Sequence, residues 1–399
     1  MSLENTQFTF NPKHKKWAMI FIVIGVLSLV FGIFMHDGIR VWANVLTSGW
    51  YFTVIALTSV FWIAVNNVAH SGWPTVFKRI PEAMGSYLIV GAVVMLIVVL
   101  GISMHWHHLY HWSHEGIMDK ASEHYDEIIA HKQPFLNNAF YSIRYAIYFI
   151  VWILLYTILR KLSLKEDLDG GVANFKKSLV FSAFFIIFFG ITSSTSAWDY
   201  IMSIDTHWFS TLFGWYNFAS MFVAFLATMT LIIIYLKNQG YLSVVSESHL
   251  HDLAKFMFAF TVFWCYLWFS QFMLIWYANI PEETIYFYER FEHYKGLFFL
   301  NVIINFFFPF LVLMDKDAKR KVRTLTVVCI ALIVGHWLDF YIMIMPGTVG
   351  EHYGIGILEI GLLLGFAGLF SLMVGNALSK ASLQPKNHPY LEESLHHHV

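Results

Sequence analysis

The sequence predicts an all-α membrane protein with ten transmembrane helices. Of its 399 residues, 58% are hydrophobic and 13% are charged, whereas soluble domains have roughly 45–50% apolar and about 25% charged residues. Aromatic residues make up 19% of the chain, which is typical of lipid-facing helices with aromatic belts at the membrane interfaces. The net charge of −1 gives no basic footprint for nucleic acid, so we expect no nucleic-acid partner.

Ten segments are long and apolar enough to cross a bilayer, since a transmembrane helix needs about 20 mostly apolar residues. No small-residue cleavage site follows the polar N-terminal stretch, so we expect no removed signal peptide. The predicted spans are 17–36, 46–69, 85–104, 140–160, 176–198, 212–236, 256–279, 296–314, 324–344 and 354–377.

The basic residues predict the orientation of these spans. Of the 25 Lys and Arg residues, only six lie on the side opposite the termini, namely Arg40, Lys120, Lys132, Arg144, Arg290 and Lys295. Because positive charge marks the cytoplasmic side, both termini are expected in the cytoplasm. This divides the chain into a cytoplasmic N-tail (1–16), one membrane domain (17–377) and a cytoplasmic C-tail (378–399).

The two largest loops on the opposite side, 105–139 and 280–295, are rich in histidine, acidic and aromatic residues. In the second loop, Pro281 followed by two acids is a helix start signal. We interpret the loops as a docking surface for an extracytoplasmic partner, with a merely solvated loop as the alternative. The candidate docking residues are His108, His111, Trp112, Pro281, Glu282 and Glu283.

Several polar residues lie inside or at the ends of the spans, where ionisable groups are costly and are by default functional candidates. His336 and Asp339 are three residues apart and therefore share a helix face. Such residues could form a titratable chain or a quinone pocket, or they could pair with one another and only fix helix packing. The candidates are His336, Asp339, Glu359, Asp199, Asp205, Gln271, His70 and Arg144, with Trp198, Tyr200 and Trp276 as pocket walls.

The sequence argues against a resident metal or haem. Cys265 and Cys329 are too few for an iron–sulfur cluster, and no Cys-x-x-Cys-His motif is present. A b-type haem needs two histidines at matching depth, and His336 is the one histidine deep within a span. His107, His111 and His114 would align on a helix, but the aromatic residues between them favour an interfacial belt. We therefore expect no metal site. The chain also lacks phosphate-loop, nucleophile-elbow and His-Glu-x-x-His motifs.

Two segments resemble the signature stretches of one membrane-protein family. They read Ser196-Ala-Trp-Asp-Tyr-Ile-Met-Ser-Ile-Asp-Thr-His-Trp208 and Ser270-Gln-Phe-Met-Leu-Ile-Trp-Tyr-Ala-Asn-Ile-Pro-Glu-Glu-Thr284. Both are similar to the second polysulfide-reductase-like (NrfD-like) membrane subunit of bacterial alternative complex III, a quinol:cytochrome c oxidoreductase. The runs His108-Leu-Tyr-His-Trp112, Tyr125-Asp-Glu-Ile128 and Leu136-Asn137 resemble it too. One departure is Thr206, where the family pattern has proline; its loss should loosen the turn.

The resemblance implies two consecutive four-helix bundles, spans 2–5 (46–198) and spans 6–9 (212–344), flanked by spans 1 and 10. It implies location in the bacterial cytoplasmic membrane beside a sister NrfD-like subunit, a periplasmic iron–sulfur subunit, and multihaem and monohaem c-type cytochrome subunits; a terminal cytochrome oxidase is left open as a further partner. Haem and iron–sulfur clusters are then expected only in partner subunits. Whether this chain itself binds quinone, menaquinone or lipids is left open.

Three functions therefore remain for the chain. It is expected to be a membrane subunit of a quinol:cytochrome c oxidoreductase that contributes a quinone pocket, a proton path or both. Alternatively, it is a purely structural anchor for periplasmic redox subunits, or an independent secondary transporter. The last is disfavoured because the spans lack the paired Gly/Pro breaks that transporters often show. For a proton path, His70 is the one obvious entry at the inner end.

Overall fold

The computed structural model describes residues 7–398, and these form helices and loops without a β-strand. Residues 1–6 of the predicted N-tail and residue 399 of the C-tail lie outside the described part. Ten helices are long and apolar enough to cross a membrane, which confirms the predicted number of spans. The chain is a multi-pass membrane protein.

The spans follow the predicted order, and most extend a few residues beyond the predicted limits. Two are interrupted. The third, Thr75–Ser103, begins with a short irregular stretch before its main helix, and the eighth contains a π-helical turn, Ile303–Phe307, before Pro309. The long helices are α1 (Pro12–Met35), α2 (Gly38–Val68), α3 (Arg79–Met84) with α4 (Leu88–Ser103), α6 (Asn138–Asp169), α7 (Ala173–Tyr200), α8 (Leu212–Asn238), α9 (Glu247–Ala278), α11 (Lys295–Val302) with α12 (Phe308–Val312), α13 (Val322–Ile344) and α14 (Ile357–Leu378).

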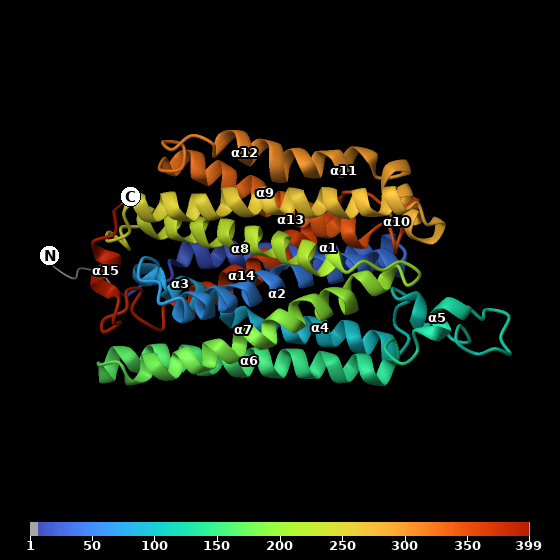
Figure 1. Cartoon of the computed structure of the whole chain (residues 1–399), viewed down its shortest axis with the longest axis horizontal. Helices are drawn as coiled ribbons and strands as arrows, with labels where there is room; N and C mark the ends of the chain where they lie inside the picture. The colour runs from blue at the N-terminus through green and yellow to red at the C-terminus, as the bar shows by residue number, and fades with distance from the viewer. Residues whose placement is uncertain (1–6, 399) are drawn as a thin grey trace.

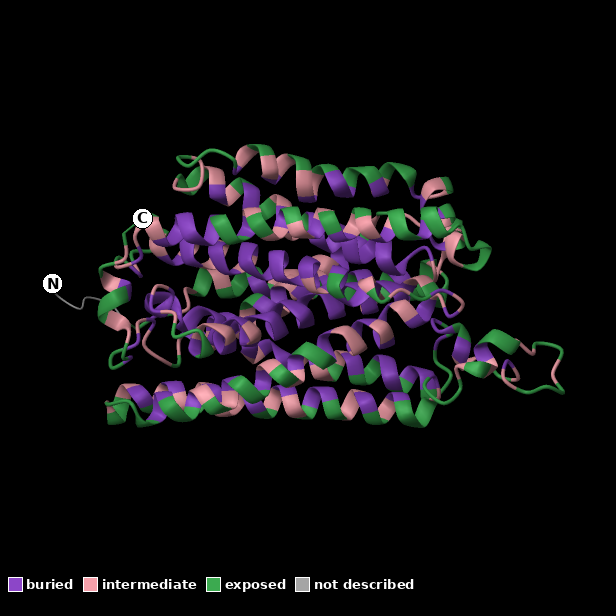
Figure 2. Cartoon of the chain, viewed as in Figure 1, coloured by how far each residue is buried: buried purple, intermediate pink, exposed green. Residues whose placement is uncertain are grey.

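The most apolar windows of α2 and α8 are 89% and 83% buried, so these two helices form the centre of the molecule. α2 packs against α4, α7, α8, α13 and α14, whereas α8 packs against α7, α9 and α13. Figure 2 shows buried residues along these central helices and exposed residues along the outer faces of α6, α11 and α12. The exposed side chains there are apolar, as expected for a surface that faces lipid.

The two ends of the molecule differ. The C-terminal segment with α15 (Leu391–Leu395) lies at one end, and α5 (Glu127–His131) and α10 (Pro281–Glu292) lie at the other (Figure 1). Gln7 donates a 2.8 Å hydrogen bond to the carbonyl of Ser379, so the N-terminal segment and the end of α14 share the first end. We call this the termini end and the opposite one the loop end.

The first and last spans pack against each other through small residues. A Cβ atom added to Gly25 of α1 would lie 2.5 Å from the Cα of Gly365 in α14. Ser28 similarly occupies the space beside Gly361. Such close backbone approach is the usual basis of helix association within lipid. Because lipid is as apolar as the helices, no hydrophobic effect drives them together, and van der Waals packing does so instead.

At the loop end, the segment predicted as the loop 280–295 is mostly a helix. Asn279 ends α9 in the left-handed conformation (φ 49°), and Pro281 stands at the first turn of α10. This confirms the helix start predicted from Pro281 and corrects the assignment of the segment as a loop. Residues 105–110 are not helical, so the three histidines His107, His111 and His114 do not align on one helix face.

Candidate functional site

Asp339 in α13 is the centre of a buried polar cluster between helices α8, α9, α11 and α13. Its side chain is fully buried. One carboxylate oxygen accepts hydrogen bonds from the Ser220 hydroxyl and the Trp264 indole N–H, both at 2.8 Å. The other accepts from the Asn301 amide at 2.7 Å and from the Tyr216 hydroxyl. Four neutral donors from α8, α9 and α11 therefore surround this carboxylate, and no Lys or Arg within residues 7–398 forms an ion pair with it.

His336 lies one turn before Asp339 on the same face of α13, as the sequence predicts. Its Nδ1 is 4.0 Å from Asp339 Oδ2 and 2.9 Å from the Ser220 hydroxyl, which thus contacts both side chains. The other ring nitrogen, Nε2, is buried and has no hydrogen-bond partner among the described residues. On the preceding turns, Leu332, Cys329 and Val328 are also fully buried. Along α13 itself, the side chains that precede His336 toward the termini end are therefore apolar, while buried Asn305 and Thr261 are polar groups on neighbouring helices.

Toward the loop end, the cluster adjoins a small cavity of about 20 Å³, enough for about one water molecule. Tyr216, which bonds to Asp339, lines this cavity together with Gln271 and Arg290. Gln271 is 3% exposed, and its Oε1 has no hydrogen-bond partner in the described chain. An unsatisfied buried oxygen beside a cavity marks a place where water or a ligand group is expected. Trp268, Phe287 and Phe298 supply aromatic walls.

A larger groove of about 290 Å³ at the loop end shares Tyr286 and Arg290 with that cavity. The Arg290 guanidinium lies 3.3 Å from the centroid of the Tyr286 ring, and Trp208 stacks on Tyr286 with ring centroids 3.8 Å apart. This stack forms the boundary between groove and cavity. Arg290, Gln271 and Tyr216 therefore line the space between the groove and Asp339.

The groove holds several titratable side chains. Asp205 lies 3.9 Å from Arg290, and burial raises the pKa of its carboxyl although the Arg290 charge opposes this shift. His207 and Asp126 are 2.7 Å apart. The pKa of Asp126 is lowered because hydrogen bonds from a backbone N–H of α5 and from His207 outweigh the effect of burial. The sequence prediction that Asp205 lies at this end of the fifth span is confirmed.

The predicted candidates Asp199 and Arg144 form a closed ion pair in the first half of the domain. Arg144 donates two hydrogen bonds of 2.8 Å to the Asp199 carboxylate, and Tyr148 donates a third of 2.9 Å. Both charged side chains are at least 92% buried. Arg144 is further held by the carbonyl and ring of Phe135. Asp199 is thus compensated by a cation, whereas Asp339 is not.

These two sites occupy corresponding places in the two halves. Asp199 and Asp339 lie near the loop end of α7 and α13, each followed closely by an Ile-Met pair, and Gly49-Trp50-Tyr51 in α2 recurs as Gly214-Trp215-Tyr216 in α8. The helix before each carboxylate offers side chains four residues apart. In α6 these side chains are Arg144 and Tyr148, and in α11 and the π turn that follows it they are Asn301 and Asn305.

The other predicted candidates lie apart from Asp339. Glu359 forms a separate buried ion pair, 2.9 Å from Arg40, and accepts from the Gly356 N–H. His70 is exposed at the termini end, in a left-handed conformation (φ 52°). Trp276 is 65% exposed and faces away from the interior. Trp198 and Tyr200 belong to the surroundings of Asp199 and line neither cavity nor groove.

The candidate docking residues are exposed with one clear exception. His108 and His111 are exposed on the outer loop, and Pro281 and Glu282 are exposed at the start of α10, where Glu283 is partly covered. Trp112, however, is 3% exposed and packs against Tyr110 and Tyr141. Trp112 as a partner-contacting residue is therefore a wrong prediction, because its ring forms the core of the loop.

Sequence reasoning missed most of the residues that hold Asp339. Tyr216, Ser220, Trp264 and Asn301 are ordinary components of apolar or aromatic helices when viewed one span at a time. The repeated Gly-Trp-Tyr does not identify Tyr216 either, because the matching Tyr51 donates to the Ile333 carbonyl and not to Asp199. No protein-family model and no curated protein sequence matches the chain.

Proposed function

We propose that the chain is a membrane subunit of a respiratory quinol:cytochrome c oxidoreductase of the alternative complex III type, in which Asp339 exchanges protons with the loop end. The observation that carries this proposal is a buried carboxylate without a cation, connected through Tyr216 to a cavity and an open groove. Buried ionisable groups of this kind within membranes commonly serve in proton relays. The electron carriers would reside in partner subunits.

The proposed path has a direction. Asp339 is five residues from the end of α13 at Ile344, about 7.5 Å at 1.5 Å per residue. Tyr216, Gln271 and Arg290 lie on the loop-end side of it, whereas apolar side chains follow His336 toward the termini end. Proton exchange with the loop end is therefore favoured over conduction across the whole membrane. The larger groove, with Trp208 and Tyr286 as aromatic walls and Arg290 as a polar group, has room for a quinone head group.

The proposal includes the arrangement and orientation expected from the sequence. Helices α2, α4, α6 and α7 contact one another, as do α8, α9, α11 and α13, in support of two consecutive four-helix bundles flanked by α1 and α14. The positive charge at the termini end supports a cytoplasmic location for both termini in a bacterial inner membrane. The groove would then face the periplasm, where iron–sulfur and c-type cytochrome partners, beside a sister NrfD-like subunit, would dock.

The experiment uses the complex that co-purifies with this chain from native membranes in mild detergent. Mass spectrometry should first detect multihaem cytochrome and iron–sulfur partners in stoichiometric amounts. Asp339→Asn is then expected to lower quinol:cytochrome c turnover at least tenfold without dissociating the complex. Asp37→Asn is the matched control, because Asp37 is an exposed carboxylate at the same end with no side-chain cap hydrogen bond; it should leave turnover unchanged.

A purely structural anchor is the second candidate function, and the closed ion pairs Asp199–Arg144 and Glu359–Arg40 favour it. Under that function, Asp339→Asn would leave turnover and proton release at the parental level, and only assembly would respond to polar substitutions. Purification of the chain alone, without redox partners, would refute both functions and leave independent transport to be tested by uptake into vesicles.

A further inference from the structure

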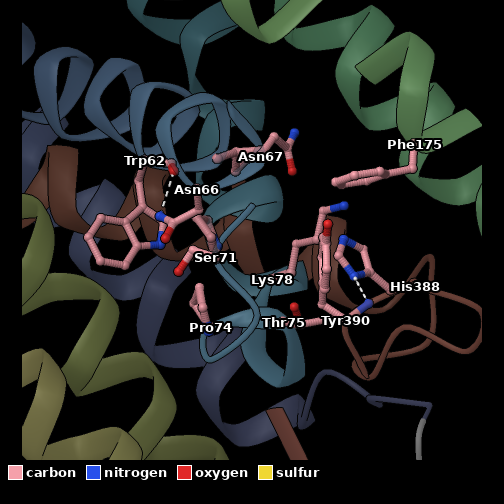
Figure 3. A pocket seen from close by; sticks show the side chains of 12 residues that line it. Trp62, Asn66, Asn67, Ser71, Pro74, Thr75, Lys78, Phe175, His388 and Tyr390 are labelled. Carbon is pink, nitrogen blue, oxygen red and sulfur yellow. Dashed lines mark hydrogen bonds between the residues drawn. The ribbon is translucent and has the colours of Figure 1, made fainter. Parts of the chain in front are cut away.

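A separate small, partly open cavity of about 20 Å³ lies at the termini end, on the side of the molecule away from Asp339. It is bounded by the end of α2, the segment that leads into α3, the start of α7 and the C-terminal segment. Figure 3 shows Asn67, Lys78, Phe175 and Tyr390 arranged around it. The C-terminal segment is held there by Ser394, whose hydroxyl donates to the Trp73 carbonyl at 2.6 Å and accepts from the Val76 N–H.

Lys78 is the cation of this cavity. Its side chain is 91% buried, and its nearest carboxylate oxygen, on Glu166, is 3.8 Å from Nζ, beyond hydrogen-bond distance. The neighbouring Arg79, by contrast, donates 2.7 Å and 2.8 Å hydrogen bonds to Glu82 and Ser163. The Lys78 ammonium lines the cavity and has a carboxylate at ion-pair distance but none at hydrogen-bond distance, so its donors are available to a ligand there.

The remaining wall of the cavity presents neutral hydrogen-bonding groups. These belong to Asn66, Asn67, Ser71, Thr75 and Tyr390. The Asn67 amide N–H donates to Ser182, which leaves its carbonyl oxygen on the cavity side (Figure 3). Burial, together with the charges of Lys78 and Arg79, lowers the pKa of His388 to about 2. The wall therefore offers an oxyanion the Lys78 ammonium and several hydroxyl donors, whereas Arg79 is already paired with Glu82 and Asp167.

The depth of the cavity fits the polar border of a membrane. It lies where α2 ends at Val68 and α7 begins at Ala173, and apolar side chains are exposed next to it, with Val68 42% and Val172 51% exposed. A ligand with a polar head and an acyl tail could place its head in the cavity and its tail along this apolar surface. Basic pockets at the cytoplasmic border of membrane proteins bind anionic lipid head groups in this way.

We propose that this cavity binds the phosphate group of an anionic phospholipid, with Lys78 as its ion-pair partner and the Ser71, Thr75 and Tyr390 hydroxyls as donors. The inference rests on the cytoplasmic orientation proposed above but not on the proton path at Asp339. A lipid held there would join α2, α7 and the C-terminal segment. Free phosphate shares the same chemistry, so the experiment must separate the two sources.

The test is a titration of the delipidated full-length protein in detergent, followed by native mass spectrometry. The probes are dioleoylphosphatidylglycerol, dioleoylphosphatidylcholine and inorganic phosphate, each alone. Phosphatidylglycerol is expected to bind at one site, and Lys78→Gln is expected to weaken it at least tenfold, the effect of losing one hydrogen bond to a charged group. Lys176→Gln, at an exposed lysine of the same end, should have no effect.

Lys78→Gln leaves the buried Glu166 carboxylate without its cation and could unfold the protein, so two further variants serve as controls. Lys78→Gln/Glu166→Gln removes both charges and should still lose phosphatidylglycerol, and Lys78→Arg should retain it. If millimolar inorganic phosphate displaced phosphatidylglycerol from the parental protein, the natural ligand would be free phosphate and the lipid proposal would be wrong. Equal binding of phosphatidylglycerol to the parental protein and to both Gln variants would overturn the proposal, as would equal binding of phosphatidylcholine and phosphatidylglycerol with no response to Lys78. Quinol turnover of Asp339→Asn is independent of either outcome.

Discussion

The structure predicts opposite roles for the two corresponding carboxylates, and the Arg144–Asp199 pair provides the sharper test. Arg144→Met removes the two 2.8 Å hydrogen bonds to Asp199 and leaves Tyr148 as the remaining donor to that carboxylate. Breaking one partner out of a buried ion pair costs about 3–5 kcal/mol, because the other charge stays buried without compensation. Arg144→Met should therefore lower the free energy of unfolding by about that amount.

The double variant Arg144→Met/Asp199→Asn determines whether this loss reflects the stranded charge. With both charges removed, the cost should fall to about 1–2 kcal/mol, the value of a few neutral hydrogen bonds. The double variant is then expected to be about 2–3 kcal/mol more stable than Arg144→Met. Asp339→Asn should cost about 1–3 kcal/mol, because its new amide NH2 faces donors that a carboxylate oxygen accepted, but it leaves no partner charge behind.

Denaturant unfolding of the purified protein in detergent, followed by tryptophan fluorescence, measures all four proteins under one condition. The reasoning fails if Arg144→Met is as stable as the parent, or if the double variant is no more stable than the single one. It also fails if Asp339→Asn is destabilised as strongly as Arg144→Met, because the two carboxylates would then be equivalent.

Three further predictions concern the contact between α1 and α14, the outer loop and the C-terminal segment. Gly25→Leu should destabilise the protein by about 1–3 kcal/mol through overpacking against Gly365, measured by denaturant unfolding; an unchanged midpoint would contradict the close approach. The lowered pKa of Asp126 means that its contact with His207 stabilises the outer loop above the pKa of the unfolded carboxyl and is lost as the pH falls through the lower folded pKa. Proteolysis of the loop by pepsin, divided at each pH by the cleavage rate of an unfolded reference peptide, should therefore accelerate on acidification through that range in the parent. The same ratio should not change with pH in Asp126→Asn. Ser394→Ala should lose about 1–3 kcal/mol and free the C-terminal segment, seen as faster amide hydrogen exchange over residues 391–395; parental exchange would refute it.

Local properties of the chain determined much of the fold. Hydropathy over windows of about 20 residues identified the ten spans, because each span must be apolar over the thickness of the bilayer whatever its neighbours are. Helical periodicity placed His336 and Asp339 on one face, and Pro281 marked the start of α10. These statements depend only on residues close in sequence, so they hold before any tertiary contact is known.

Tertiary structure alone decided which acids are compensated. Asp199 meets Arg144 from a different helix, and Glu359 meets Arg40 across 319 positions of sequence, whereas Asp339 meets only neutral donors. It likewise buried Trp112 and turned Trp276 outward. A side chain's partner depends on which helices pack together and in which rotation, and that information is non-local. The sequence by itself therefore located the polar residues within the membrane, and packing determined which of the acids are paired with a cation.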